Sequence, residues 1–334
     1  MDRFVAETVG ERLVDLKIAC GWPRPGTPDL PDQAAVRAYS EALREVKIVD
    51  PACGSGAFLI TTLRYLLDEW KALRDLRRGL FNEVTREEED VVIAEILSRS
   101  IYGVDINPSS VEIAKLALWL HTARGNRPLS SLDNHIVEGN SLIGPEFYKG
   151  LAPHSAEKRE RINVFDWHEA FPEVFDRNGG GFDTVVENPP YVKLQNFTKV
   201  HRDVSDFLAR RVNAGGRYFS TQAGSFDLYL PFIEKGIDLL NDQGRLGFIN
   251  PSVWIMNDYG KALRAHIAER RQMYGWIDFG SFQIFDEAHG IYRPTVFYQN
   301  TERRNQGSRA CSAARTVSRV VGIRHSTAEG LAAS

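Results

Sequence analysis

The chain has 334 residues, of which 43% are hydrophobic and 25% are charged, and its formal charge is −3. This is the composition of an ordinary globular protein, and it excludes a chain that is disordered along most of its length. The charge is uneven, because residues 301–334 carry six Arg against two acidic residues, which leaves residues 1–300 at −7. A nucleic-acid-binding protein that is basic throughout is therefore excluded, while a local basic groove is not.

The sequence also argues against membrane and secreted classes. No run of 18 uncharged apolar residues occurs, and residues 1–7 carry acidic side chains without an apolar stretch, so neither a membrane span nor a secretory signal is expected. Cys20, Cys53 and Cys311 lie far apart, which excludes a disulfide scaffold and a CxxC zinc site. We expect a cytoplasmic protein without a metal centre.

The pattern of apolar residues changes near Val46. Residues 1–20 read as amphipathic helix, and four prolines in residues 21–32 predict a loop. Beyond Val46, short apolar runs alternate with longer helical stretches. The expected strands are residues 47–50, 101–105, 135–138, 182–186, 245–249, 275–279 and 293–298. The expected helices are residues 57–73, 88–99, 109–122, 225–242 and 257–270.

This alternation predicts an α/β fold in which helices cover both faces of a parallel sheet. Ligands of such folds bind at the carboxyl ends of the strands, so chemistry is expected there. Residues 145–180 and 192–224 have weak periodicity and are interpreted as insertions or substrate-facing loops. Residues 301–334 contain no convincing element and are interpreted as an irregular tail.

A glycine-rich turn follows the first expected strand and reads Asp50-Pro51-Ala52-Cys53-Gly54-Ser55-Gly56. Gly54 and Gly56 allow a sharp turn and a close approach of a ligand to the backbone. The turn lacks the Gly-Lys-Ser/Thr of a phosphate-binding loop and the third glycine of the dinucleotide fingerprint. An ordinary strand–helix turn is the alternative interpretation.

Asp105 ends the second expected strand and is followed by Ile106-Asn107-Pro108. A carboxylate there can accept hydrogen bonds from both ribose hydroxyls, and Ile106 can pack on an adenine ring. Capping of the next helix is the alternative role. The 55 residues between Asp50 and Asp105 exceed the usual spacing of about 20, so residues 74–95 are interpreted as an insertion.

Two polar turns follow later strands. Asn140, in Gly139-Asn140-Ser141-Leu142, can hydrogen-bond an adenine edge, although a plain turn is the favoured interpretation of this motif taken alone. The strand over 182–186 leads into Asn188-Pro189-Pro190-Tyr191. The prolines remove two donors and aim carbonyl oxygens rigidly, Asn188 adds an acceptor, and Tyr191 adds a ring. This set suits a planar amino group.

Together these motifs resemble those of S-adenosylmethionine-dependent DNA adenine-N6 methyltransferases, most closely the methylase modules of type IIG restriction-modification and phage-defence enzymes. The resemblance covers roughly residues 44–300. It implies a Rossmann-like methyltransferase fold whose sheet has seven mostly parallel strands, the last antiparallel. We accordingly divide the chain into an N-terminal helical segment and Pro-rich loop (1–43), a catalytic domain (44–300) and a basic tail (301–334).

The resemblance also implies roles for matching residues. Those expected at the methionine end of the cofactor are Asp50, Ala52, Cys53, Gly54 and Gly56. Asp105 and Ile106 are expected to hold ribose and adenine, and Asn140 matches an adenine contact for which many relatives carry Asp.

The target adenine, flipped out of the duplex, is expected in the Asn-Pro-Pro-Tyr pocket. Asn188 and the carbonyl of Pro189, held rigid by Pro190, would grip the amino group, and Tyr191 would stack on the base. Phe285 is expected as the opposing aromatic, with Phe282 as the alternative register. Double-stranded DNA is the expected partner, and the residues expected to supply positive charge are Lys193, Lys199, His201, Arg202, Arg210, Arg211 and Arg217.

Some features depart from the family pattern. Glu187 stands where relatives usually have Gly, and its charge would repel DNA phosphate unless it points away. An upstream aromatic cofactor-binding segment, for which Phe4 is a weak substitute, and a C-terminal target-recognition domain are not found. We therefore expect a truncated chain or one that takes specificity from a partner subunit.

Three alternatives to DNA adenine methylation stay open at this point. A protein glutamine-amide methyltransferase also uses Asn-Pro-Pro-Tyr, but the long segment after the motif favours DNA. Cytosine N4 is less favoured, because Ser often replaces the first residue of the motif there. A non-catalytic remnant that binds only cofactor or DNA is the third.

Overall fold

A central β-sheet organises the computed structural model, which describes residues 1–83, 89–122, 132–148, 160–222, 224–270, 273–278 and 294–300. The strands are β1 (Ile48–Asp50), β2 (Ile101–Asp105), β3 (Ile136–Glu138), β4 (Phe182–Glu187), β5 (Leu240–Pro251), β6 (Met273–Asp278) and β7 (Pro294–Asn300). Their order is β3-β2-β1-β4-β5-β7-β6. The five strands from β3 to β5 are parallel, and β7 runs antiparallel to both of its neighbours.

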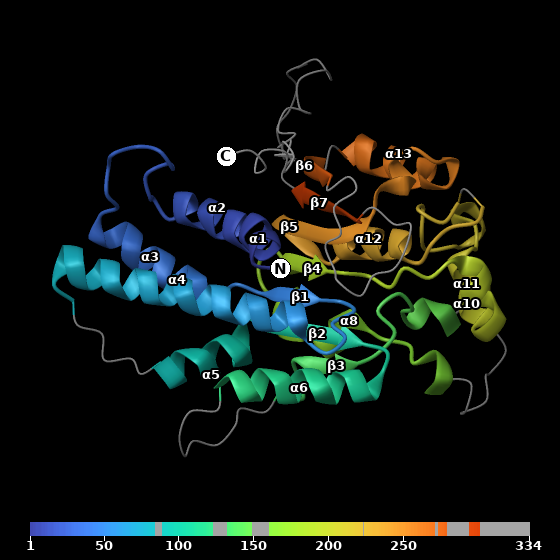
Figure 1. Cartoon of the computed structure of the whole chain (residues 1–334), viewed down its shortest axis with the longest axis horizontal. Coiled ribbons are helices and arrows are strands. Elements are labelled where there is room, and N and C mark those ends of the chain that lie inside the picture. Colours follow the sequence, from blue (N-terminus) through green and yellow to red (C-terminus); the bar gives the residue numbers. More distant parts are fainter. Residues whose placement is uncertain are drawn as a thin grey trace, which may run out of the picture.

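Helices from the first third of the chain cover one face of the sheet. They are α1 (Asp2–Val5), the π-helix η1 (Ala6–Gly10), α2 (Glu11–Ala19), α3 (Gln33–Arg44), α4 (Ala57–Phe81), α5 (Glu89–Arg99) and α6 (Pro108–Thr122). Their apolar side chains form one core with Ile48, Ile101 and Ile136 of the sheet. Figure 1 shows α2, α3 and α4 side by side.

The opposite face is covered by shorter helices from the later part of the chain. They are η2 (Pro145–Tyr148), α8 (Trp167–Ala170), α9 (Pro172–Phe175), α10 (Leu194–Val200), α11 (Arg202–Leu208), η3 (Val212–Ala214), α12 (Tyr229–Asp238), η4 (Ser252–Ile255), η5 (Asp258–Gly260) and α13 (Lys261–Arg270). Val49, Tyr102 and Val185 join this second core. Residues of opposite parity in β1 and β2 thus enter opposite cores, as the alternation of side chains along a strand requires.

Ion pairs and close packing join the N-terminal helices to strands β4 and β5, which come late in the chain. Arg12 of α2 pairs with Asp183 of β4 at 2.9 Å, and Asp15 pairs with Arg245 of β5 at 2.8 Å. Gly247 of β5 has no side chain, which leaves room for Phe4 and Thr8. Figure 1 shows α1 and α2 next to β5, although more than 200 residues separate them in sequence.

The expected α/β class with a parallel sheet is confirmed, and so is the antiparallel last strand. The expected helix 225–242 was wrong at both ends, because α12 spans Tyr229–Asp238 and Leu240 already pairs with Phe182 in the sheet. The loops expected at 145–180 and 192–224 contain short helices, whose burial in the second core outweighs their weak periodicity. Residues 301–334 lie outside the described residues.

The segment interpreted as an insertion, 74–95, is partly helical. Helix α4 continues eight residues beyond the expected end at 73, and α5 begins at Glu89. No helix within the described residues has the length and apolar character needed to cross a membrane.

Candidate functional site

The polar residues singled out from the sequence meet at the carboxyl ends of β2, β1 and β4. These three strands are neighbours in that order, so Asp105, Asp50 and Glu187 end adjacent strands. In open parallel sheets this edge is the one at which ligands bind. The residues that follow each strand therefore line one site.

The glycine turn between β1 and α4 has the conformation that its sequence predicts. Gly54 and Gly56 adopt positive φ, +53° and +83°, which side-chain-bearing residues rarely adopt. A Cβ on Gly56 would lie 3.1 Å from the Cβ and 3.2 Å from the Cα of Ala114 in α6. Both features require glycine, and together they bring the N-terminus of α4 to the edge of the sheet.

The rest of the turn is held by hydrogen bonds to β1 and β2. The N–H of Ala52 donates to Asp50 Oδ1 at 3.1 Å, and the N–H of Cys53 donates to the carbonyl of Val104 at 3.0 Å. A Cβ on Gly103 would lie 3.1 Å from Cys53 Sγ, so this buried thiol packs against β2. Cys53 can thus meet a ligand chiefly through its backbone.

Asp105 connects the two turns of the site. Its Oδ2 accepts from the N–H of Gly54 at 2.9 Å and its Oδ1 from the N–H of Asn107 at 2.8 Å. A carboxylate accepts about four hydrogen bonds, so both oxygens keep capacity for hydroxyl donors. Ile106 next to it is 49% exposed, which leaves an apolar surface at the mouth of the site.

Asn140 is buried and already hydrogen-bonded within the chain. Its Nδ2 donates to the carbonyl of Ile162 at 3.2 Å, and its Oδ1 accepts from the N–H of Leu142 at 3.3 Å. Ser141 Oγ donates to the carbonyl of Pro51, which attaches this turn to the glycine turn. The sequence did not single out that last contact, because no local pattern marks it.

Two buried carboxyl groups stand close to this edge of the sheet. Burial raises the pKa of Asp50 to about 8; the N–H of Ala52 acts in the opposite direction, and the charge of Asp105 adds to the rise. Burial also raises the pKa of Glu187 well above its usual value, and the charges of Asp50 and Asp105 raise it further. Burial therefore favours the neutral form of both acids in the free chain. The sequence suggested a charged Glu187, and its burial could not be read there.

The Asn-Pro-Pro-Tyr loop directly follows β4. Tyr191 Oη lies 2.5 Å from Asn188 Oδ1 and 2.8 Å from the carbonyl of Ile249 in β5, two acceptors that share one phenolic proton. The Tyr191 ring meets Tyr229 edge-on, with ring centroids 6.3 Å apart. Tyr191 therefore contacts the amide oxygen of Asn188 on one side, while Asn188 itself stays exposed.

A cleft of about 360 Å³ opens next to this loop. Its lining residues are Lys193, Gln195, Ser225, Phe226, Asp227, Val253, Asn257 and Tyr259. The segment after the loop forms one wall, because the N–H of Leu194 donates to the carbonyl of Phe226 and the N–H of Leu228 to that of Val192. The volume falls within the range of small-molecule sites.

The basic residues expected to contact DNA do not all have the same role. Lys193, Lys199, Arg202 and Arg211 are exposed around α10 and α11. Arg217, by contrast, is half-buried and pairs with Asp238 at 2.5 Å, so its charge is committed within the chain.

Phe285 and Phe4 are two further aromatic positions predicted from the sequence. Phe285 and its alternative Phe282 lie outside the described residues. Phe4 is 5% exposed and packs on Phe58 of α4 with ring centroids 5.1 Å apart, so it offers a ligand little surface.

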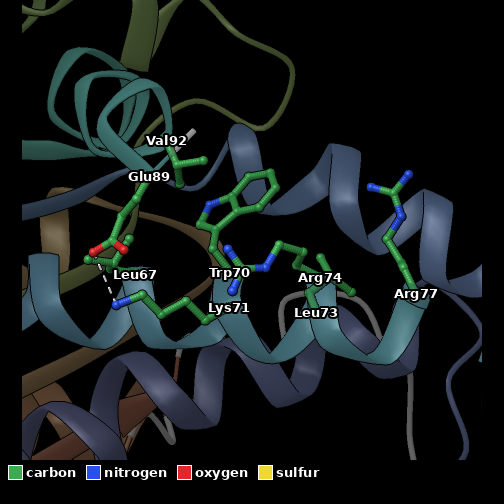
Figure 2. A pocket seen from close by; sticks show the side chains of 8 residues that line it. All are labelled: Leu67, Trp70, Lys71, Leu73, Arg74, Arg77, Glu89 and Val92. Carbon is green, nitrogen blue, oxygen red and sulfur yellow. Dashed lines mark ion pairs between the residues drawn. The ribbon is translucent and has the colours of Figure 1, made fainter. Parts of the chain in front are cut away.

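A separate pocket lies between α4 and α5 (Figure 2). Its lining combines apolar residues such as Trp70 with charged ones, of which Lys71 and Glu89 form an ion pair at 3.2 Å. Its first residue, Leu67, lies ten residues beyond the start of α4, or about 15 Å along the helix. This pocket is therefore distinct from the strand edge and its polar groups.

Comparison with known proteins agrees with this geometry. The family model described as Eco57I restriction-modification methylase matches residues 99–285, more than half of the chain. The chain belongs to this family. A second model, an RMKL-like methyltransferase domain, matches residues 34–138.

Individual relatives of this Eco57I family member are much longer proteins. It is 30% identical over 252 residues to the type II restriction enzyme and methyltransferase RM.Eco57I of Escherichia coli, covering 72% of this chain and 23% of that protein. It is 26% identical over 294 residues to the adenine-specific methyltransferase PglX of Streptomyces coelicolor, covering 82% of this chain and 22% of PglX. The chain thus spans about a quarter of the length of these relatives.

The fold is also shared with a solved structure. The type IIL restriction-modification enzyme MmeI, in complex with DNA, aligns with a TM-score of 0.53 and 14% identity over 90% of this chain and 36% of MmeI. At this identity the likeness shows the fold alone. The α/β architecture is therefore common to this Eco57I family member and to a larger restriction-modification enzyme.

Proposed function

We propose that this chain transfers a methyl group from S-adenosylmethionine to the N6 amino group of adenine in double-stranded DNA, within a restriction-modification or phage-defence system. The observation that carries the proposal is the Asn188–Tyr191 loop at the end of β4, one strand from the glycine turn of β1. Family membership supports it.

The described residues fit the cofactor at the β1–β2 edge. Gly54 and Gly56 leave the turn free of side chains, Asp105 has spare acceptor capacity for ribose hydroxyls, and Ile106 is exposed for an adenine face. Glu187 has two buried carboxyl oxygens without a partner among the described residues, which a bound group with donors or positive charge would satisfy. S-adenosylmethionine would bring an activated sulfonium methyl to this place.

The adenine amino group is a poor nucleophile, because its lone pair is delocalised into the ring. Asn188 Oδ1 and the Pro189 carbonyl would accept its two N–H bonds and favour a more tetrahedral nitrogen, while one proton leaves as the methyl is transferred. Tyr191 Oη can turn its proton to the Ile249 carbonyl and release Asn188 Oδ1 for the substrate. Positioning and preorganised dipoles supply the acceleration, with no covalent intermediate.

The target base must leave the duplex to reach this loop. Flipping costs a few kcal/mol, and stacking on Tyr191 and on an opposing aromatic, for which we propose Phe285, offsets about 1–3 kcal/mol per ring. The exposed Lys193 and Lys199 beside the cleft favour a polyanionic substrate over a protein glutamine. We propose that residues 44–300 form the catalytic unit, with seven strands, and that sequence specificity comes from a further domain or subunit.

Transfer of labelled methyl from S-adenosylmethionine to unmethylated genomic DNA tests the proposal. We expect N6-methyladenine with the wild type and a loss of roughly 10²–10³-fold in rate for Asn188→Ala, the scale for removing one preorganised hydrogen bond. Asn196→Ala, an exposed asparagine on α10, is the matched control and should keep its activity. Saturable cofactor binding without transfer by the wild type would refute the activity and indicate a binding remnant.

A further inference from the structure

Glu187 is a buried acid that the proposed chemistry leaves unused. The residue is fully buried, and neither carboxyl oxygen has a hydrogen-bond partner among the described residues. Buried polar groups almost always have a partner, because leaving one unsatisfied is costly. An unpaired buried acid at the end of β4 therefore calls for a ligand that completes it.

Glu187 lies between the two halves of the site, because it ends β4, which pairs with β1, and directly precedes Asn188. Its carboxyl interacts electrostatically with Asp50 and Cys53 on the glycine-turn side, and with Tyr191 on the side of the Asn-Pro-Pro-Tyr loop. Under the proposed function, the reacting methyl must pass between those same two groups. The sulfonium that carries the methyl is therefore brought close to Glu187.

We propose that Glu187 makes this site prefer the positively charged S-adenosylmethionine over its neutral product, S-adenosylhomocysteine. This inference rests on the proposed function, because it takes S-adenosylmethionine as the cofactor. It adds a specificity role that the sequence motifs do not contain. The preference would reduce inhibition by the product, which stays in the site after methyl transfer.

Release and uptake of one proton by Glu187 balance the charge of the site. In the free chain, burial and the neighbouring carboxyls favour the neutral form of Glu187. A bound sulfonium favours the carboxylate, so Glu187 releases its proton to solvent as the cation enters. When the sulfonium becomes a thioether, the carboxylate loses its partner and takes up a proton from solvent.

The groups around Glu187 give the pH dependence its sign. The titratable groups that interact with it electrostatically are Asp50 of β1, Asp105 of β2, the Cys53 thiol of the turn and the Tyr191 phenol. Binding that releases a proton strengthens as pH rises, by up to about tenfold per pH unit for one proton. Asp50 can add a second proton, and its titration is linked to that of Glu187 through their charges.

Calorimetric titration of the wild type and Glu187→Gln with each nucleoside, in phosphate and in Tris, measures affinities and released protons without any turnover. Gln matches the shape of the neutral acid, so the variant should fold normally, and circular dichroism checks this. We expect the affinity ratio of S-adenosylmethionine to S-adenosylhomocysteine to fall on the order of tenfold in Glu187→Gln. Proton release on binding S-adenosylmethionine should be smaller in Glu187→Gln than in the wild type.

Two controls complete the design. Glu138→Gln removes an exposed carboxylate at the end of β3 and should leave the ratio unchanged, because exposed charges are screened. Glu187→Asp restores the acid and should recover part of the preference. Equal weakening of both nucleosides in Glu187→Gln, or an unchanged ratio, would overturn this inference and leave the methyltransferase proposal intact. A wild type that binds neither nucleoside would overturn both.

Discussion

Asp183 is the buried carboxylate on which hydrogen bonds from four separate segments of the chain converge. Its Oδ1 accepts from Arg12 Nη2 and Asn241 Nδ2, each at 2.9 Å, and its Oδ2 accepts from Arg177 Nη2 at 2.9 Å and from the N–H of Lys47 at 3.0 Å. The Asp183 and Arg12 side chains are 8% and 7% exposed. We predict that Asp183→Asn destabilises the chain strongly without touching the strand edge that holds the candidate site.

The size of the expected stability loss follows from the four groups that donate hydrogen bonds to Asp183. Whichever way the new amide turns in the Asp183→Asn variant, its NH₂ group faces one arginine donor and one neutral donor. The substitution thus loses a charge-assisted hydrogen bond of about 1.5–3 kcal/mol and a neutral one of about 0.5–1.5 kcal/mol. It also leaves Arg12 buried without a full charge partner, and breaking such pairs costs about 3–5 kcal/mol in total. That is a large part of the stability of about 5–15 kcal/mol typical of natural domains.

Urea unfolding followed by circular dichroism measures the loss at pH 7. Asp206→Asn is the matched control, because Asp206 pairs with Arg202 at 3.9 Å with both side chains exposed. We expect the control to change stability by less than about 1 kcal/mol. A loss below about 1 kcal/mol for Asp183→Asn as well would refute the reasoning, since it would mean that the buried network contributes no more than a surface pair.

The pH dependence gives a second check. Burial alone would raise the pKa of Asp183, but the charges of Arg177 and Arg12 and the N–H of Lys47 outweigh it, so its pKa lies below the usual value. The network's stabilisation is therefore complete above the unfolded pKa of about 3.9 and is lost as pH falls through the lower folded value. The gap in stability between wild type and Asp183→Asn should be constant near neutrality and narrow below about pH 4.

Three further predictions concern the site and its surroundings. Gly56→Ala should lose about 1–3 kcal/mol of stability in urea unfolding and should bind the cofactor more weakly in calorimetry, because the φ of Gly56 is +83° and the new Cβ meets Ala114. Unchanged stability and affinity would contradict the role of the turn. Burial, with the charges of Asp50 and Asp105, raises the pKa of the Cys53 thiol. Iodoacetamide treatment at pH 7.5, about one unit below the pKa of a free thiol, followed by peptide mapping, should therefore find Cys20 labelled long before Cys53. Equal labelling rates would show that the turn opens. Lys193→Ala should lower affinity for a DNA duplex and reduce the slope of log affinity against log salt by about 1 in fluorescence anisotropy; an unchanged slope would remove Lys193 from the interface.

Several features of this protein follow from local sequence. A strand lies at each expected place, although β5 extends beyond the expected 245–249 at both ends, because short apolar runs bounded by turn residues favour strands over helices of ten or more residues. The turn at Gly54 and Gly56 forms as predicted, since glycine tolerates positive φ. The Asn188–Tyr191 loop follows β4 for a similarly local reason, because two prolines cannot continue a central strand.

Long-range packing decided the rest. Glu187 reads as a charged neighbour of the loop, but in the fold it ends β4 between β1 and β5, where both oxygens are buried and burial raises its pKa. Asp183 pairs with Arg12, which lies 171 residues earlier in the chain, and Tyr191 donates a hydrogen bond to the carbonyl of Ile249 in β5. A local pattern specifies backbone conformation, whereas the protonation and hydrogen-bond partners of a side chain depend on which distant strands and helices exclude water around it.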